Sequence, residues 1–284
     1  MPLDSFYRRS LRSAWVCVLG LLLQPAACAD LMLFPTRVVF DRNDRAAQVE
    51  LVNQGKTPET YRIVLVNRRM SEDGVFQEMP GAMAGEQSAL EMLRYSPKQV
   101  TIEPGGSQTV RILLRKPAEL APGEYRSHLQ FDRVADDEAD GGLDARGGRP
   151  GGSVGVTIST LVGASIPVIV RHGETQADTR LSALRLLPAA AQEPPVMLFE
   201  VHRTGNRSTY GDFTVTYVPS QGTPVELSMV GGLAVYVPNV MRRVRMPLRL
   251  APGLVLKGGS LRVAYRERPE SGGKLLAEAA LAVP

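Results

Sequence analysis

Three histidines are the first side chains to consider for catalysis or metal binding, because imidazole titrates near neutral pH and ligates metals. They are His128, His172 and His202. None stands in an H-x-x-x-H pair or beside a cysteine, so their spacing predicts no metal site. The sequence also contains no G-x-x-x-x-G-K-[ST] phosphate-binding loop. We therefore expect no enzymatic activity, no metal and no cofactor, and we interpret His128 as a solvent-facing residue of a strand.

An arginine within an apolar segment indicates a binding role instead. Arg37 follows Thr36 and precedes Val38 and Val39 in the first predicted strand. A charged group on such a strand is costly unless it meets an anion. The planar fork of the guanidinium matches a carboxylate, so we predict that Arg37 binds a carboxylate of a partner.

A second segment has a pattern that could bind a partner strand. Apolar, mostly β-branched residues alternate with small ones, and glycines precede the segment. The apolar residues on one side are Val154, Val156, Ile158 and Val162. The pattern fits a core strand, and it also fits an exposed edge strand that offers a partner both backbone hydrogen bonds and side chains.

Period-two alternation dominates the chain beyond residue 30 and predicts many short strands. Apolar and polar residues alternate in runs that include Val49, Ile63, Val110 and Leu129, and turn sequences separate the runs. The sequence therefore favours an all-β sandwich. Tyr125 stands where a tyrosine corner would open a strand of an immunoglobulin-like domain, although an ordinary half-buried tyrosine fits the position as well.

Composition divides the chain into two parts. Residues 135–153 are acidic and glycine-rich, which predicts a mobile loop, and residues 171–180 are expected to link two domains. A second set of strands follows, in a second and smaller sandwich. These strands are predicted at Val196 to Val201, Phe213 to Val218, Leu233 to Val237, Val244 to Leu250 and Leu261 to Tyr265.

The first 29 residues are typical of a secretory signal peptide. Three arginines up to Arg12 precede a short apolar run, Ala14 to Leu23, and Ala27-Cys28-Ala29 forms an A-x-A-like cleavage site. We expect the mature protein to begin at Asp30, while a cut before Cys28 would make a lipoprotein. The two cysteines of the chain both lie in this segment, so the mature chain would have no disulfide.

Charge gives little reason to expect a nucleic-acid or membrane partner. The full chain carries a formal net charge of +4, and the expected signal peptide contributes three arginines and one aspartate. The remainder is close to balanced. No segment after the signal is apolar enough to span a membrane.

Several motifs together resemble one family, the periplasmic pilus (fimbrial) chaperones. The resemblance covers the first domain, residues 30–171, and in the second domain extends only to size and β character. The matching segments are Leu33-Phe34-Pro35-Thr36-Arg37-Val38-Val39-Phe40, Val49-Glu50-Leu51-Val52-Asn53, Tyr95-Ser96-Pro97, Ile102 to Arg111 and Gly123-Glu124-Tyr125-Arg126-Ser127.

The resemblance implies two immunoglobulin-like β-sandwich domains set at an angle, with boundaries at 1–29 (signal peptide), 30–171 and 172–284. It also implies a periplasmic chaperone that binds pilus subunits by donor-strand complementation before an outer-membrane usher assembles them. Carried over to this chain, Arg37 is the cleft arginine that holds the carboxylate at the subunit's C-terminus. Val154, Val156, Ile158 and Val162 match the donor strand.

One position departs from the family pattern. The family usually has a lysine late in the donor strand, but here that region reads Ala164-Ser165-Ile166-Pro167-Val168, and no lysine occurs between Lys116 and Lys257. Pro167 also removes a backbone donor, which an edge strand tolerates. Arg171 is our candidate for completing the carboxylate site, although an arginine elsewhere in the fold could serve equally.

Two other classes of protein remain open at this point. A pilus subunit or adhesin would be expected to have an incomplete sandwich and an N-terminal extension ready to donate. A surface β-sandwich enzyme or sugar-binding module would need clustered carboxylates and aromatic platforms, but aromatic residues make up only 6% of this chain.

Overall fold

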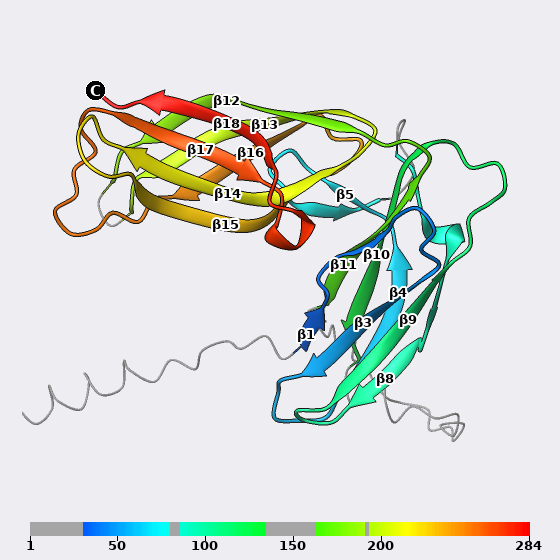
Figure 1. The fold of residues 1–284 in the computed structure, drawn as a ribbon. Coiled ribbons are helices and arrows are strands. Elements are labelled where there is room, and N and C mark those ends of the chain that lie inside the picture. The colour runs from blue at the N-terminus through cyan, green and yellow to red at the C-terminus, as the bar shows by residue number, and fades with distance from the viewer. Residues whose placement is uncertain (1–30, 80–85, 135–162, 191–192) are drawn as a thin grey trace, which may run out of the picture.

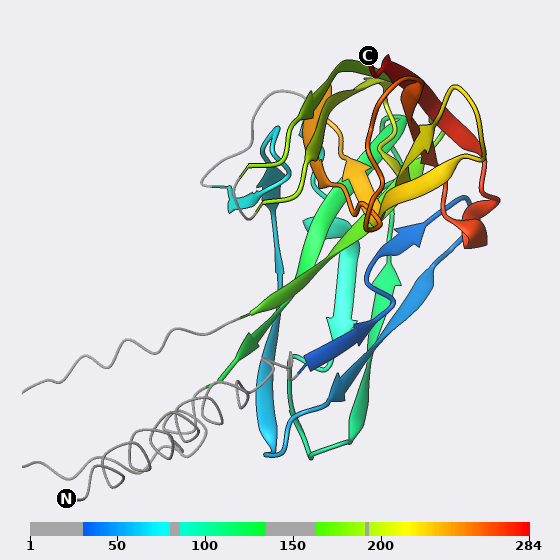
Figure 2. The ribbon, with the colours of Figure 1, turned by 90° about the vertical axis from the view of Figure 1, so that its left-hand side faces the viewer.

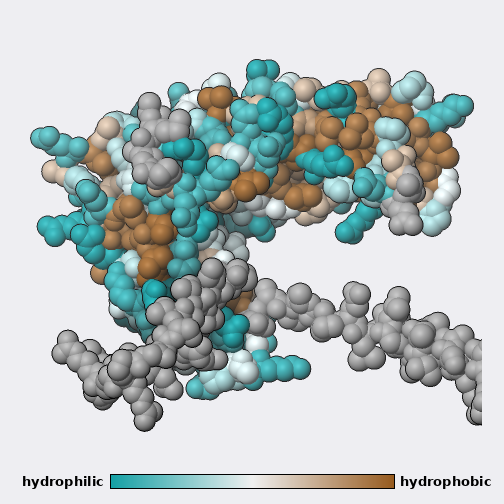
Figure 3. All heavy atoms as spheres, turned by 180° about the vertical axis from the view of Figure 1, so that it is seen from behind, coloured by the Kyte–Doolittle hydropathy of each residue, from teal (hydrophilic) through white to brown (hydrophobic). Residues whose placement is uncertain are grey.

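The computed structural model describes residues 31–79, 86–134, 163–190 and 193–284. Nearly all regular structure in these ranges is β-strand, arranged in two lobes that meet at an angle (Figure 1). We call them the N-terminal sandwich, which holds β1 to β11, and the C-terminal sandwich, which holds β12 to β18. Seen from behind, the two lobes leave a broad hollow on one side of the molecule (Figure 3). The predicted class, two immunoglobulin-like sandwiches set at an angle, is confirmed.

The N-terminal sandwich consists of a four-stranded and a five-stranded sheet, with strand orders β1-β3-β9-β7 and β2-β11-β10-β4-β8. The strands of the first sheet are β1 (Leu31–Phe34), β3 (Ala46–Asn53), β9 (Ser107–Leu114) and β7 (Leu93–Ser96). Those of the second are β2 (Val38–Phe40), β11 (Ala164–His172), β10 (Gly123–Arg133), β4 (Glu59–Val66) and β8 (Gln99–Ile102). A 3-10 turn, η1 (Leu90–Met92), precedes β7.

The alternation seen in the sequence is the reason these strands pack face to face. Val49, Ile63, Val110 and Leu129 are all buried in one core cluster between the two sheets. Each such side chain contributes about 1.5–3 kcal/mol through removal of apolar surface from water. Tyr125 opens β10, and its hydroxyl donates a 2.9 Å hydrogen bond to a backbone carbonyl four residues upstream. This contact makes Tyr125 a tyrosine corner.

The first two strands lie in different sheets. β1 pairs antiparallel with β3, whereas β2 pairs parallel with β11, with Val38 opposite Val168. The chain therefore crosses from one sheet to the other at residues 35–37. This crossing places Arg37 at the start of the β2–β11 ladder, in a cleft lined by residues of both sandwiches. Figure 2 shows the two lobes turned by 90° from the view of Figure 1.

The C-terminal sandwich has a three-stranded sheet, β12-β13-β16, and a four-stranded sheet, β15-β14-β17-β18, around a second core. The strands are β12 (Ala177–Leu187), β13 (Val196–Gly205), β14 (Thr209–Val218), β15 (Val225–Val235), β16 (Met241–Pro247), β17 (Ser260–Arg266) and β18 (Leu275–Ala282). A 3-10 turn, η2 (Pro269–Ser271), joins β17 to β18.

All five strands predicted in this half are present, but β12 and β18 were not predicted. The linker is also shorter than expected, because β11 extends to His172 and β12 begins at Ala177. Only residues 173–176 connect the two sandwiches outside regular structure.

A small apolar cluster and a hairpin join the two sandwiches. Met70 and Ile169 pack against Ala234 and Tyr236 of the second sandwich. The hairpin of β5 (Arg68–Met70) and β6 (Phe76–Glu78) reaches across to the second sandwich (Figure 1). Its Met70 carbonyl accepts a 2.8 Å hydrogen bond from Asn239. The junction is thus packed rather than a free hinge.

Candidate functional site

Arg37 lies in the junction and contacts aromatic rings of the C-terminal sandwich. Its guanidinium carbon lies 4.4 Å from the ring centre of Tyr210 and 5.4 Å from that of Tyr236, and Nη1 donates a 3.4 Å hydrogen bond to the Tyr236 hydroxyl. These contacts fix the side chain and attract the cation. Among the described residues, no carboxylate lies within ion-pair distance of Arg37, so its positive charge is available to an anion.

Arg171 is differently placed. Its side chain is 10% exposed, and its guanidinium already binds two carboxylates, Glu124 at 3.2 Å and Asp41 at 3.0 Å. Glu124 is buried, and it also accepts hydrogen bonds from the backbone and hydroxyl of Ser208 in the second sandwich. Glu124 therefore links Arg171 to the second sandwich. The further role of Arg171 in holding a partner's carboxylate stays a prediction.

Arg37 and Arg171 line the same cleft between the sandwiches, which has a volume of about 550 Å³. Two further cations line it from the C-terminal sandwich, Arg207 and Lys274. The acidic residues of its wall are Asp41 and Glu267. Four cations against two acids make the cleft suited to an anion.

Sequence reasoning brought Arg37 to this cleft but missed Arg207 and Lys274. Arg207 follows the turn Gly205-Asn206, and Lys274 follows a glycine pair. In the sequence, these two turns indicate only where strands end. Nothing in the local sequence indicates that the two loops face the N-terminal sandwich.

The proposed donor residues Val154, Val156, Ile158 and Val162 lie outside the described residues. Among the described residues, β11 begins at Ala164. It pairs with β10 from Ala164 onward, but its pairing with β2 begins only at Val168. One edge of residues 164–167 therefore has no partner among the described strands.

The position of Pro167 bears on the missing lysine. Pro167 immediately precedes Val168 on β11, just as Arg37 precedes Val38 on the paired strand β2. The two residues are thus neighbours where the ladder begins. Pro167 carries no charge, so among these two positions Arg37 alone supplies a cation.

His128 is buried, which corrects our expectation that it faces solvent. Its exposed fraction is 1%, because Phe76 of the β5–β6 hairpin packs edge-on against its ring at 4.9 Å. Neither ring nitrogen has a hydrogen-bond partner. Burial, together with repulsion from Arg126 and Arg68, lowers the pKa of His128 to about 3. The alternation of β10 could not predict the β5–β6 hairpin, which covers the polar face of β10 on which His128 lies.

Ser182, His202 and Glu200 meet on the C-terminal sandwich, but their geometry is not that of a catalytic triad. His202 Nε2 lies 2.8 Å from the Ser182 hydroxyl and 3.2 Å from Glu200. A catalytic triad needs the acid on the other ring nitrogen, so that it can orient the imidazole while Nε2 serves the nucleophile. Within the described ranges no cluster of three or more metal-ligating side chains occurs. No helix in these ranges is long and apolar enough to cross a membrane.

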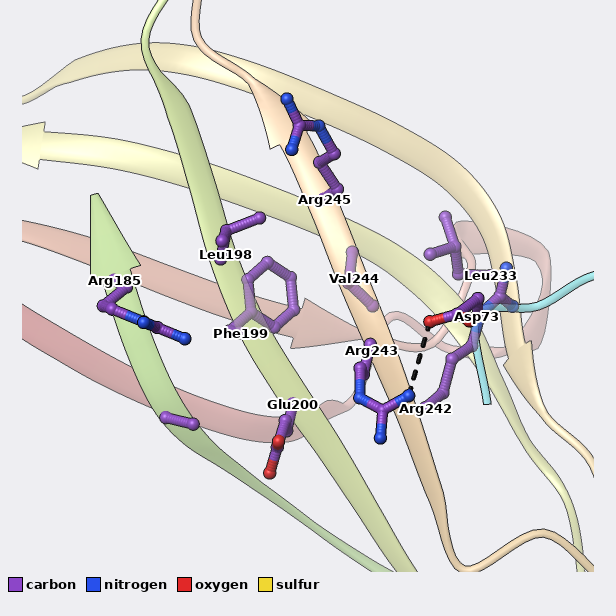
Figure 4. Close-up of a pocket in the computed structure, with 11 residues that line it drawn as sticks. Asp73, Arg185, Leu198, Phe199, Glu200, Leu233, Arg242, Arg243, Val244 and Arg245 are labelled. Carbon is purple, nitrogen blue, oxygen red and sulfur yellow. Dashed lines mark ion pairs between the residues drawn. The ribbon is translucent and has the colours of Figure 1, made fainter. Parts of the chain in front are cut away.

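A second cavity of about 510 Å³ lies on the C-terminal sandwich (Figure 4). Exposed arginines surround Leu198 there, and Arg185 and Arg245 are its cross-strand neighbours. A third, Arg243, is ion-paired with Glu72 at 2.7 Å and with Asp73 at 3.6 Å. From the N-terminal sandwich only Asp73, in the turn of the β5–β6 hairpin, lines this cavity. Among the described residues, no aromatic ring forms a cation–π contact with its arginines like those that Arg37 makes.

The fold and cleft define a class: a two-sandwich protein with a cationic groove at the junction and an open strand edge leading to it. Comparison with known proteins finds no matching family model and no matching curated protein. Among solved structures, the chain is similar to the CupB2 chaperone of Pseudomonas aeruginosa, with 14% identity, 89% of this chain and 100% of that chain covered, and a TM-score of 0.43.

Two further similar structures contain a chaperone together with a subunit. One is the CsuC–CsuE chaperone–tip subunit pre-assembly complex from Csu pili of Acinetobacter baumannii, with 13% identity, 90% and 98% coverage and a TM-score of 0.43. The other is the Salmonella enterica SafA pilin with the SafB chaperone, with 12% identity, 91% and 98% coverage and a TM-score of 0.39. The likeness to pilus chaperones expected from the sequence is thus found among solved structures.

Proposed function

We propose that this protein is a periplasmic chaperone that binds pilus or fimbrial subunits by donor-strand complementation before their assembly at the outer membrane. The observation that carries the proposal is the half-open edge of β11, which runs directly to the cleft where Arg37 lies without a carboxylate partner. An incomplete sandwich can pair its backbone with such an edge. Its terminal carboxylate then meets the cation at the end of the strand.

The roles of individual residues follow from this arrangement. Val154, Val156, Ile158 and Val162 fill the groove of the subunit, and Arg37, with Arg171 beside it, binds the subunit's C-terminal carboxylate. Residues 1–29 form the signal peptide, residues 30–171 the chaperone domain and residues 172–284 the second sandwich. An outer-membrane usher is a further partner, and the protein acts without catalysis, metal, cofactor, nucleic acid or a membrane span.

A pair of substitutions by threonine tests the donor strand. Ile158→Thr should change the unfolding free energy of the free protein by no more than about 0.5 kcal/mol, as substitutions at exposed positions usually do, and should weaken its complex with a pilin-like subunit. Val168→Thr is the matched control. Its side chain is fully buried in the N-terminal core, so the free protein should lose roughly 1–3 kcal/mol of stability. Equal destabilisation of the free protein by both substitutions would make residue 158 an ordinary core position.

Arg37→Ala tests the other end of the site in the same assay. The complex should weaken by about 2–5 kcal/mol, because the substitution leaves a carboxylate without its partner. A pull-down from periplasmic extract separates the remaining classes: a pilus subunit or adhesin would recover a chaperone or an assembled fibre rather than free subunits.

A further inference from the structure

Some charged side chains of the junction cleft form ion pairs, and others have no ion-pair partner among the described residues. Arg171 is bound by Glu124 and Asp41, so one cation and one acid of the cleft wall neutralise each other. Glu267, the other acid, forms no ion pair with a described residue. Arg37 and Arg207 likewise have no carboxylate within 4.0 Å among the residues that the structure describes. Each sandwich therefore supplies a cation without an ion-pair partner among the described residues, Arg37 from the first and Arg207 from the second.

The backbone around Arg207 is fixed on both sides. Its N–H donates to Gln176 at 3.1 Å, and its carbonyl accepts a hydrogen bond from Arg203 at 3.0 Å. The turn before it is tight, because Gly205 adopts a φ of +89° and leaves no room for a Cβ beside the carbonyl of Gln176.

The residue after Arg207 anchors the same turn to the first sandwich. Ser208 donates both its backbone N–H and its hydroxyl to Glu124, the carboxylate that also binds Arg171. Arg207 is thus held at the junction by its neighbours, while its own guanidinium forms no hydrogen bond or ion pair with a described residue. The fixed backbone keeps Arg207 at the junction, where its guanidinium can bind an anion that enters the cleft.

The electrostatic setting of Arg207 is mixed. Burial, and next the charge of Arg171, lower its pKa from the usual value, whereas the carboxylates of Asp41, Glu124 and Glu267 raise it, although none of these lies within ion-pair distance. A bound carboxylate would relieve the repulsion from Arg171. Lys274, the other cation from the second sandwich, is exposed, so water solvates its charge and it gains less than Arg207 from binding an anion.

We infer that Arg207, in place of the already paired Arg171, is the second cation of the carboxylate site, so that Arg37 of the first sandwich and Arg207 of the second both bind the C-terminal carboxylate of a subunit. The inference rests on the proposed function and deepens it. It gives the C-terminal sandwich a direct part in recognition, and it replaces the charge that Pro167 does not provide. Binding then also draws the two sandwiches together through one shared anion.

The probe is a synthetic peptide of the last residues of the pilin-like subunit, made once as the free acid and once as the C-terminal amide. The wild-type protein should bind the acid more tightly than the amide. Arg207→Gln should weaken binding of the acid by about tenfold or more and leave binding of the amide unchanged. Arg207→Lys keeps the charge and should retain most of the preference for the acid.

Arg245→Gln is the matched control, since it removes the same charge from an exposed position of the same sandwich, outside the cleft. It should preserve the preference, and thermal melts of every variant check the fold. If Arg37→Ala abolishes the preference for the acid and Arg207→Gln keeps it intact, the inference about Arg207 is overturned and the proposed function stands. If the wild-type protein binds acid and amide equally, the carboxylate site itself is refuted.

Discussion

Replacing His128 by leucine should remove much of the acid sensitivity of the protein. The ring is 1% exposed, is covered by Phe76, and lies close to the cations Arg126 and Arg68. Neither of its nitrogens has a hydrogen-bond partner, so an apolar side chain of similar size strands no donor or acceptor. At pH 7 the variant should therefore match the wild type to within about 1 kcal/mol.

The magnitude follows from the change in pKa on folding. In the unfolded chain His128 takes up a proton near its ordinary pKa of 6.5, whereas in the folded protein burial delays this to about 3. Between these two values the unfolded state binds more protons, so stability is full above pH 6.5 and is lost as the pH falls. The loss is about 2 kcal/mol at pH 5 and about 4 kcal/mol at pH 3.

Urea unfolding of both proteins at a series of pH values from 7.5 to about 4.5 measures this effect. The difference in unfolding free energy between His128→Leu and wild type should grow steadily in favour of the variant below pH 6.5. Other groups titrate in both proteins, and their contributions cancel in the difference. A difference that stays constant with pH would show that His128 has the same pKa in the folded and unfolded states, and the reasoning from its burial would be wrong.

Three further substitutions probe the junction and the fold. Glu124→Ala should cost about 3–5 kcal/mol in urea melts because it strips the buried Arg171 of a carboxylate, and a cost below about 1 kcal/mol would contradict the pairing. Tyr125→Phe deletes the hydroxyl of the tyrosine corner and should lower stability by about 1 kcal/mol, seen as a reduced thermal midpoint; an unchanged midpoint speaks against that contact. Tyr236→Leu removes the ring that contacts two arginines and should loosen the junction, which small-angle scattering would report as a larger radius of gyration, whereas an identical scattering curve would rule this out.

Alternation along the strands predicted the two cores well, because inward side chains such as Val49 and Val110 must be apolar in either sandwich. The two strands that escaped prediction have weaker signals. β18 reads Leu-Leu-Ala-Glu-Ala-Ala-Leu-Ala, a composition that favours helix, and it becomes a strand by pairing with β17. In β12 a bulge between Ser182 and Arg185 breaks the alternation.

Only part of the candidate site could be predicted from the sequence. Arg37 could be identified because it lies among apolar residues of one strand. The surroundings of Arg207 are instead created by two sandwiches that meet, and no local pattern encodes that contact. His128 failed for the same reason, since the hairpin that buries it comes from a distant part of the chain. Contacts between elements far apart in sequence lie beyond what alternation can report.

The division of the first strands between two sheets has a consequence for how the molecule is made. β2 leaves the ribosome among the first segments, yet its partner β11 is the last strand of the same sandwich, so Val38 and Val168 cannot pair until that whole unit has been synthesised. Such long-range pairing raises contact order and slows folding. A chain cut short after β10 would keep the segments that form most of both sheets and still lack the strand that joins β2 to β10. Completion of this sandwich is therefore timed by the arrival of β11, the same strand whose edge is left half open.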